Sequence, residues 1–205
     1  SSAASDVYKR QVCAMVFSNL IFLYLFLPVC LIAYFFCPGI RAKNAVLILF
    51  SLIFYAWGEP VYLLLMIASA AVNWYFGLLI ERRRKKIFLI LALVLDLGCL
   101  AVFKYAGFFV ENLNAVFGAS IPVPQIALPI GISFYTFQAL SYTVDVWRGD
   151  VPAQRSFAKL LLYISLFPQL IAGPIVRYSD VAAQIDDRQF DASEAFYGAT
   201  RFCIG

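Results

Sequence analysis

The fold is decided in residues 61–103, VYLLLMIASAAVNWYFGLLIERRRKKIFLILALVLDLGCLAVF, where two long apolar runs flank a basic turn. The runs Val61–Ile80 and Ile87–Phe103 are each long enough, as an α-helix, to cross the roughly 30 Å hydrocarbon core of a bilayer. Between two such spans, the five positive charges in residues 81–86 are typical of a cytoplasmic loop rather than of a nucleic-acid site. This stretch therefore predicts a membrane hairpin whose turn faces the cytoplasm.

The composition of the whole chain agrees with a membrane protein. Of its 205 residues, 63% are apolar and only 14% are charged, whereas a soluble domain is near half apolar and a quarter charged. The five cysteines are odd in number and form no CxxC pair, which argues against a disulfide framework and a metal site. The chain has no histidine, so the commonest general base and the commonest metal ligand are both missing.

Further apolar stretches predict the rest of an all-α, polytopic membrane bundle. They are Phe17–Cys37, Ala45–Trp57, Ile130–Trp147 and Phe157–Val176, with another helix beginning at Ala192. We expect loops over Pro38–Asn44 and 119–129, a turn at Gly58–Pro60, and a mixed interfacial helix over 104–117. As a helix, Ala45–Trp57 reaches only about 20 Å, so it needs a thinned bilayer or a reentrant path. The bundle is therefore expected to contain short, broken or reentrant helices.

The positive-inside rule assigns each of these connections to one side of the membrane. On the cytoplasmic side we expect the loop of Arg41 and Lys43, the turn 81–86, and the loop of Arg148, Arg155 and Lys159. On the outer side we expect the N-terminus, the turn at Glu59, the loop 119–129 and the acidic segment 177–191.

The two ends of the chain predict a truncated domain. Met15 opens the first apolar run, whereas residues 1–14, SSAASDVYKRQVCA, are polar and are expected to be a non-native or disordered leader, with a genuine short tail as the alternative. A new apolar run begins near Arg201. We therefore expect residues 15–205 to be the N-terminal part of a longer membrane domain.

One carboxylate, Asp96, lies near the middle of the predicted span Ile87–Phe103. An unpaired charge in lipid costs several kcal/mol, which makes such a residue a functional candidate. The favoured interpretation is an interior carboxyl that is protonated or hydrogen-bonded to a neighbouring helix.

A polar stripe follows in the span Ile130–Trp147. On a helix, Tyr135, Gln138, Tyr142 and Asp145 fall within about 80° of one another, so they face the bundle rather than lipid. The stripe either lines a water-filled or substrate tunnel or joins helices by hydrogen bonds.

The next span is broken within residues 166–178, LFPQLIAGPIVRY. Two prolines and a glycine interrupt its hydrogen-bond ladder, which lipid tolerates only where the freed carbonyls are buried or line a cavity. A broken helix beside Gln169 indicates a cavity wall, and a simple packing kink is the alternative. No catalytic constellation is visible in these motifs.

Four segments together resemble the membrane-bound O-acyltransferase family, and more narrowly its bacterial alginate O-acetyltransferase-like branch. They are MVFSNLIFLYLFLPV at 15–29, FYAWGEP at 54–60, LPIGISFYTFQALSYTVDVWRG at 128–149 and LFPQLIAGPIVRY at 166–178. The resemblance covers Met15 to the end of the chain. It implies transfer of an acyl group, expected to be acetyl, through a central funnel to an extracytoplasmic polysaccharide hydroxyl.

The resemblance also implies which residues take part. The family's catalytic histidine lies in a later segment, so no catalytic residue is assigned here and this segment alone is expected to be inactive. Tyr135, Gln138, Gln169 and Arg177 are predicted to line or position the tunnel. Asp145 and Arg148 are expected at the cytoplasmic end of their span, near where a donor docks.

Expected partners are membrane lipid, the partner proteins of polysaccharide acetylation and the polysaccharide acceptor. The donor is acetyl-CoA or an acyl carrier, no cofactor is bound tightly, and the location is the bacterial inner membrane. Two other functions compete with this one. A transporter or flippase would show inverted repeats, which the two halves lack. A non-catalytic scaffold would be favoured by a natural stop codon just after Gly205, whereas a histidine in an apolar segment there would favour the acyltransferase.

Overall fold

The computed structural model describes residues 20–58, 60–118, 122, 128, 129, 131–170, 176–188 and 191–204. Within this part of the chain every regular element is a helix and no strand occurs, which confirms the predicted all-α class. The predicted leader 1–14 and most of the predicted loop 119–129 lie outside the described residues.

The first helix starts with an irregular turn. A π-helical segment, η1 (Phe22–Phe26), runs directly into α2 (Leu27–Phe36). The N–H of Leu27 donates to the carbonyl of Phe22, five residues earlier, just before Pro28. Because proline has no N–H and crowds the preceding turn, a widened turn before it lets the helix continue. The described part of the predicted span Phe17–Cys37 is therefore one continuous helix.

The second helix, α3 (Ile40–Gly58), is longer than the sequence predicted. The predicted loop Pro38–Asn44 and the predicted short helix Ala45–Trp57 are both wrong, because the chain turns within three residues. Gly39 takes a left-handed φ of 79°, and its carbonyl accepts the N–H of Lys43. The 19 residues of α3 reach about 28 Å, so this helix needs no thinned bilayer.

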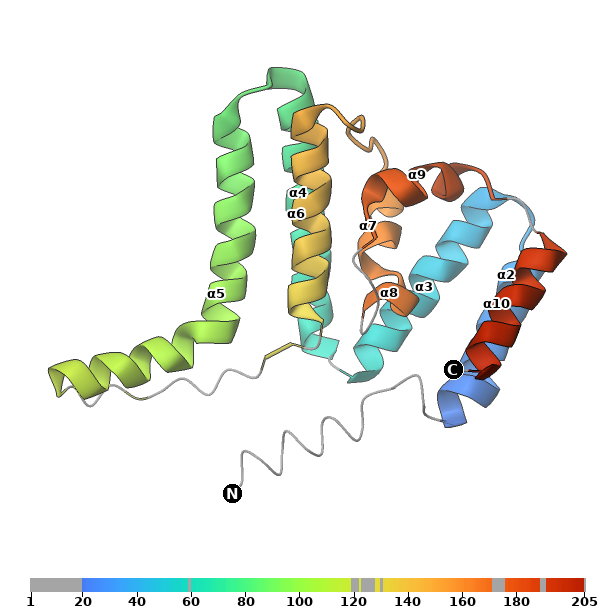
Figure 1. Ribbon diagram of the computed structural model, residues 1–205, viewed down its shortest axis with the longest axis horizontal. Coiled ribbons are helices and arrows are strands. Elements are labelled where there is room, and N and C mark those ends of the chain that lie inside the picture. The colour runs from blue at the N-terminus through green and yellow to red at the C-terminus, as the bar shows by residue number, and fades with distance from the viewer. Residues whose placement is uncertain are drawn as a thin grey trace.

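Two more long helices follow, α4 (Pro60–Arg83) and α5 (Lys86–Phe117). Within the described residues, α3, α4 and α5 are the helices that are long and apolar enough to cross a membrane. The predicted turn at Gly58–Pro60 is confirmed by the ends of α3 and α4, although Glu59 itself lies outside the described residues. The bend in α5 carries its last part away from the other helices (Figure 1), so the predicted mixed segment 104–117 continues that helix.

The remaining helices are α6 (Ile132–Arg148), α7 (Phe157–Ser165), α8 (Phe167–Leu170), α9 (Tyr178–Asp186) and α10 (Ala192–Ile204). The predicted break near Pro168 is confirmed, because Leu166 leaves the helical region with a ψ of 112° between α7 and α8. Gly173 and Pro174, which were predicted to break the same span, lie outside the described residues. The helix predicted from Ala192 is also confirmed.

From its start, α7 runs inward toward α8, and α9 lies back at the end where α7 begins (Figure 1). Three contacts fix α9 at that end. Gln154 Nε2 donates to the hydroxyl of Tyr178 at 2.7 Å, Asn44 Nδ2 donates to the carbonyl of Ile185 at 2.9 Å, and Lys159 pairs with Asp186. We call this end, which carries Arg41, Lys43, residues 82–86, Arg148, Arg155 and Lys159, the basic end.

This return corrects the predicted order of the loops. The three predicted cytoplasmic connections do share one end, but the segment 177–191 was predicted to lie on the opposite side. The described part of that segment instead packs on the basic loops through two hydrogen bonds and one ion pair. The ion pair joins Lys159 and Asp186. Within the described residues, α7 therefore begins at the end where α9 lies, as a reentrant segment would.

The core lies where α4 meets α5, α6 and α7. Gly77 of α4 faces Tyr142 of α6, and a Cβ atom at Gly77 would lie 2.7 Å from the Tyr142 hydroxyl. Tyr142 is fully buried, and its hydroxyl accepts the backbone N–H of Gln154 at 3.0 Å. The close approach of α4 and α6 therefore positions the loop that leads to α7.

Gly77→Ala should destabilise the protein by about 1–3 kcal/mol, because the added methyl group overpacks a fully buried tyrosine. Gly98→Ala on α5 is the matched control, since a Cβ atom at Gly98 would meet nothing within 4 Å and alanine favours a helix. Thermal unfolding of the purified full-length protein in detergent measures both. Equal stability of the two variants would contradict the packing.

The reentrant path predicts sidedness in a cysteine-free background. Ser179→Cys on α9 and Arg83→Cys on α4 should react with a membrane-impermeant maleimide from the same side. Val61→Cys, at the other end of α4 and 74% exposed, should react from the opposite side. Labelling of Ser179→Cys from the same side of the membrane as Val61→Cys would contradict the reentrant path.

Candidate functional site

Two of the residues predicted to line the tunnel meet in the interior. Gln138 of α6 is 2% exposed, and its Nε2 donates to Oε1 of Gln169 on α8 at 3.1 Å. The Oε1 atom of Gln138 is buried and accepts no hydrogen bond from the described residues. An amide acceptor left in this state at the centre of a bundle can bind a water molecule or a substrate hydroxyl.

Local backbone contacts explain why Gln169 reaches α6. Where the ladder breaks between α7 and α8, the N–H of Phe167 donates to Ser51 Oγ of α3 at 3.2 Å. Gly131, before α6, has a left-handed φ of 75°, and a Cβ atom there would lie 2.8 Å from the Leu170 carbonyl. Only glycine permits both this conformation and this approach, so α8 packs directly beside the start of α6.

The other two predicted tunnel residues lie elsewhere. Tyr135 is 1% exposed and lines a different cavity, of about 180 Å³, together with Asp96 and Thr136. Arg177 is exposed and immediately precedes α9 at the basic end. The structure thus brings Gln138 and Gln169 together and separates Tyr135 and Arg177 from them. The role of all four as tunnel residues stays a prediction.

Gln169 also borders a cavity of about 130 Å³ beneath α9, which we call the α9 cavity. Its walls come from α3, α7, α8 and α9 and the residues just after α7 and α9. They are Leu47, Leu162, Tyr163, Leu166, Gln169, Val181, Gln184, Ile185 and Arg188. The cavity therefore runs between an arginine at the basic end and the interior amide pair, with mostly apolar walls.

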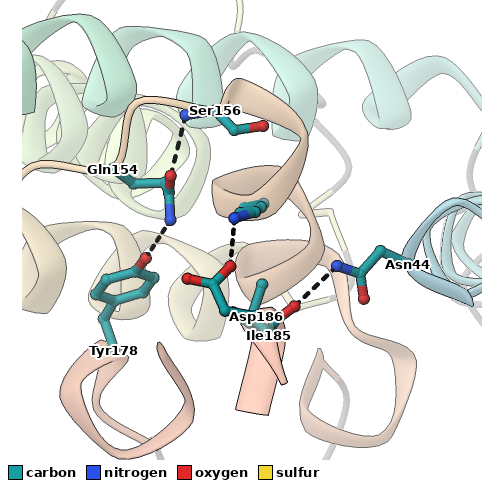
Figure 2. A network of polar contacts seen from close by, with 7 residues as sticks. Asn44, Gln154, Ser156, Tyr178, Ile185 and Asp186 are labelled. Atoms are coloured by element: carbon teal, nitrogen blue, oxygen red, sulfur yellow. Dashed lines mark hydrogen bonds and ion pairs between the residues drawn. The ribbon is translucent and has the colours of Figure 1, made fainter. Parts of the chain in front are cut away.

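A wider cleft of about 400 Å³ lies at the basic end between Glu81, the loop 151–155 and α9. Figure 2 shows how Gln154 organises it: the side chain donates to the Tyr178 hydroxyl at 2.7 Å and accepts the N–H of Ser156 at 3.0 Å. Burial raises the pKa of Tyr178, so its hydroxyl keeps its proton and can donate onward. Arg155 of the same loop pairs with Glu81 at 2.5 Å.

Asp96 is held by the neighbouring helix, as the favoured interpretation predicted. Its Oδ1 accepts Asn73 Nδ2 at 3.0 Å and Ser69 Oγ at 3.4 Å, both from α4. Asn73 Oδ1 in turn accepts Thr143 Oγ1 of α6 at 2.7 Å. These side chains join α4, α5 and α6 through one buried polar network.

Sequence reasoning missed Asn73 and Thr143, as well as the Gln154–Tyr178 pair. A signal for the first two was present, because an asparagine within the run Val61–Ile80 needs a polar partner as much as Asp96 does. No comparable signal marked Gln154, whose partner Tyr178 comes from a distant segment.

The described residues hold no cluster of three metal-ligating side chains. With no histidine in the chain, the amides and hydroxyls found here can bind, orient and shield a substrate, but none is a general base for neutral pH. The fold and the cavities define a class: a helical membrane protein with a polar interior reached from its basic end.

Comparisons with known proteins narrow this class. The chain is 42% identical over 200 residues to the probable alginate O-acetylase AlgI of Pseudomonas aeruginosa and 41% identical to that of Azotobacter vinelandii. Both alignments cover 93% of this chain, but 38% and 40% of the relatives. A peptidoglycan O-acetyltransferase of Helicobacter pylori is 31% identical over 90% of this chain and 41% of that protein.

The predicted resemblance to bacterial alginate O-acetylases is thereby confirmed. The chain spans about two fifths of the length of the curated relatives it matches. No protein-family model matches the chain, and no solved structure is similar to it. Assignment to the wider membrane-bound O-acyltransferase family stays a prediction.

The buried network predicts coupling between α4 and α6. Asn73→Ala and Thr143→Ala should each destabilise the protein. The stability lost by the double variant should be smaller than the sum of the two single losses by about 0.6–1.7 kcal/mol. Denaturant unfolding of the full-length protein in mixed micelles measures this difference. Pairing Asn73→Ala with Asn112→Ala, whose amide donates to the carbonyl of Phe108 on its own helix, should show no coupling. Coupling as large in this control pair would contradict a specific network.

Proposed function

We propose that the full-length protein is a multi-pass enzyme of the bacterial inner membrane that transfers an acetyl group to a hydroxyl of an extracytoplasmic polysaccharide. The observation that carries this proposal is the 37–42% identity to alginate O-acetylases over 93% of the chain. The basic end faces the cytoplasm in this proposal, as the positive-inside rule requires.

The geometry supports a role for this segment in holding the donor and acceptor. In acyl transfer, the acceptor hydroxyl attacks the acyl carbonyl, its proton passes to a base, and the carrier leaves with the bonding electrons. The described residues supply an apolar cavity that ends at Gln169 and an unfilled acceptor on Gln138. Such groups orient the reactants and exclude water, while the base comes from a part of the protein outside this chain.

Gln138→Ala in the full-length protein should lower acetyl transfer about tenfold or more, because a misplaced reactant loses much of the benefit of orientation. The matched control is Asn112→Ala, which removes an exposed amide from α5. The measurement is transfer of radiolabelled acetyl to polysaccharide by membranes that contain equal amounts of each protein.

Residues 1–205 expressed alone should transfer no acetyl group. The proposal fails if the full-length protein transfers none to any of alginate, peptidoglycan and other exopolysaccharides. A role for the interior amides fails separately if Gln138→Ala retains the activity of Asn112→Ala.

A further inference from the structure

Two cations converge on one aromatic ring at the basic end. Lys43 of α3 lies with Nζ 5.2 Å from the ring centre of Tyr34, on α2. Arg188, just after α9, lies with Cζ 5.8 Å from the same centre. All three side chains are half-buried, so these charges are less hydrated than those of the exposed residues Arg82–Arg84.

The charges of this pair are not neutralised within the described residues. No described carboxylate forms an ion pair with either cation. The ion pairs among the described residues are Lys159–Asp186 and Arg155–Glu81. Nε and Nη2 of Arg188 are fully buried, and no described residue accepts a hydrogen bond from them. A guanidinium cannot shed its proton at physiological pH, so burial leaves these donors in need of an anion.

The same arginine lines the α9 cavity, whose far wall is Gln169. Leu47, Leu162 and Ile185 supply apolar wall between the two. A molecule that fits this arrangement has an anionic head at Arg188 and a thin, largely apolar extension that points toward the amide pair. Arg offers a planar fork of N–H donors and Lys a point charge, and both suit the oxygens of a phosphate.

We propose that Arg188 and Lys43, with Tyr34 between them, form a binding site for a phosphate group at the mouth of the α9 cavity. This inference rests on the proposed function in one respect: if the protein transfers acetyl groups, the bound phosphate belongs to the carrier of the acyl group. A phospholipid headgroup presents the same chemistry, and the experiment distinguishes these two sources.

The test uses the purified full-length protein in nanodiscs. The variants are Arg188→Gln and Lys43→Gln, with Arg188→Lys as the charge-conserving rescue. Arg82→Gln is the control, because it removes an equal charge from the basic end at an exposed position away from the cavity. Thermal unfolding establishes that each variant is folded, and if Arg188→Gln fails to fold, Lys43→Gln takes its place in the comparison.

Two probes are measured on each variant. Coenzyme A binding by isothermal titration reports a soluble phosphate-bearing carrier, and native mass spectrometry reports retained phosphatidylglycerol. We expect Arg188→Gln to weaken one of the two probes by about tenfold or more, the loss of about 1.4 kcal/mol or more, with Arg82→Gln unchanged and Arg188→Lys intermediate. Weaker coenzyme A binding by Arg188→Gln identifies the acyl carrier as the source of the phosphate. Weaker phosphatidylglycerol binding identifies a lipid as the source.

The proposal is overturned if folded Arg188→Gln and Lys43→Gln bind both probes as Arg82→Gln does. It is also overturned if the wild-type protein binds neither probe. Failure of acetyl transfer by the wild-type protein, with binding of a probe still dependent on Arg188, would refute the proposed function and leave the phosphate site standing.

Discussion

The fold depends on one constraint: backbone groups freed by a broken helix must find partners inside the protein. Between α7 and α8 the helical hydrogen-bond ladder stops at Leu166. The next backbone N–H, that of Phe167, donates to the hydroxyl of Ser51 on α3. In lipid an unpaired N–H would cost several kcal/mol, so the break is stable only against α3. Because this contact holds the break within the bundle, α8 lies beside α6 and α9 returns to the basic end.

The return of α9 gives the basic end its character. Asp186 and Ile185 bring a carboxylate and a carbonyl to Lys159 and Asn44, and Tyr178 reaches Gln154. A surface ion pair contributes little by itself, so the buried hydrogen bonds and the packing of Tyr178 against Tyr142 hold the helix more firmly. The consequence for function is a single face that carries both the cleft and the mouth of the α9 cavity.

Much of the fold follows from local signals in the sequence. The apolar runs, the turn at Gly58–Pro60 and the break at Pro168 each reflect a property of a few adjacent residues. The return of the chain to the basic end does not, because it depends on Ser51 and Asn44, more than a hundred positions away from their partners. The polarity of Gln138 and Gln169 indicated an interior position for each, whereas their hydrogen bond and the placement of Arg177 depend on the paths of α8 and α9.

The packing of α9 on the loops of the basic end can be tested by cross-linking in native membranes. Lys159→Cys and Asp186→Cys are combined in the full-length, otherwise cysteine-free protein and treated with a short bifunctional maleimide. We predict a cross-linked peptide pair by mass spectrometry, and none when Asp186→Cys is combined with Val61→Cys at the far end of α4. Absence of the first cross-link, with both cysteines labelled from opposite sides of the membrane, would contradict the reentrant fold.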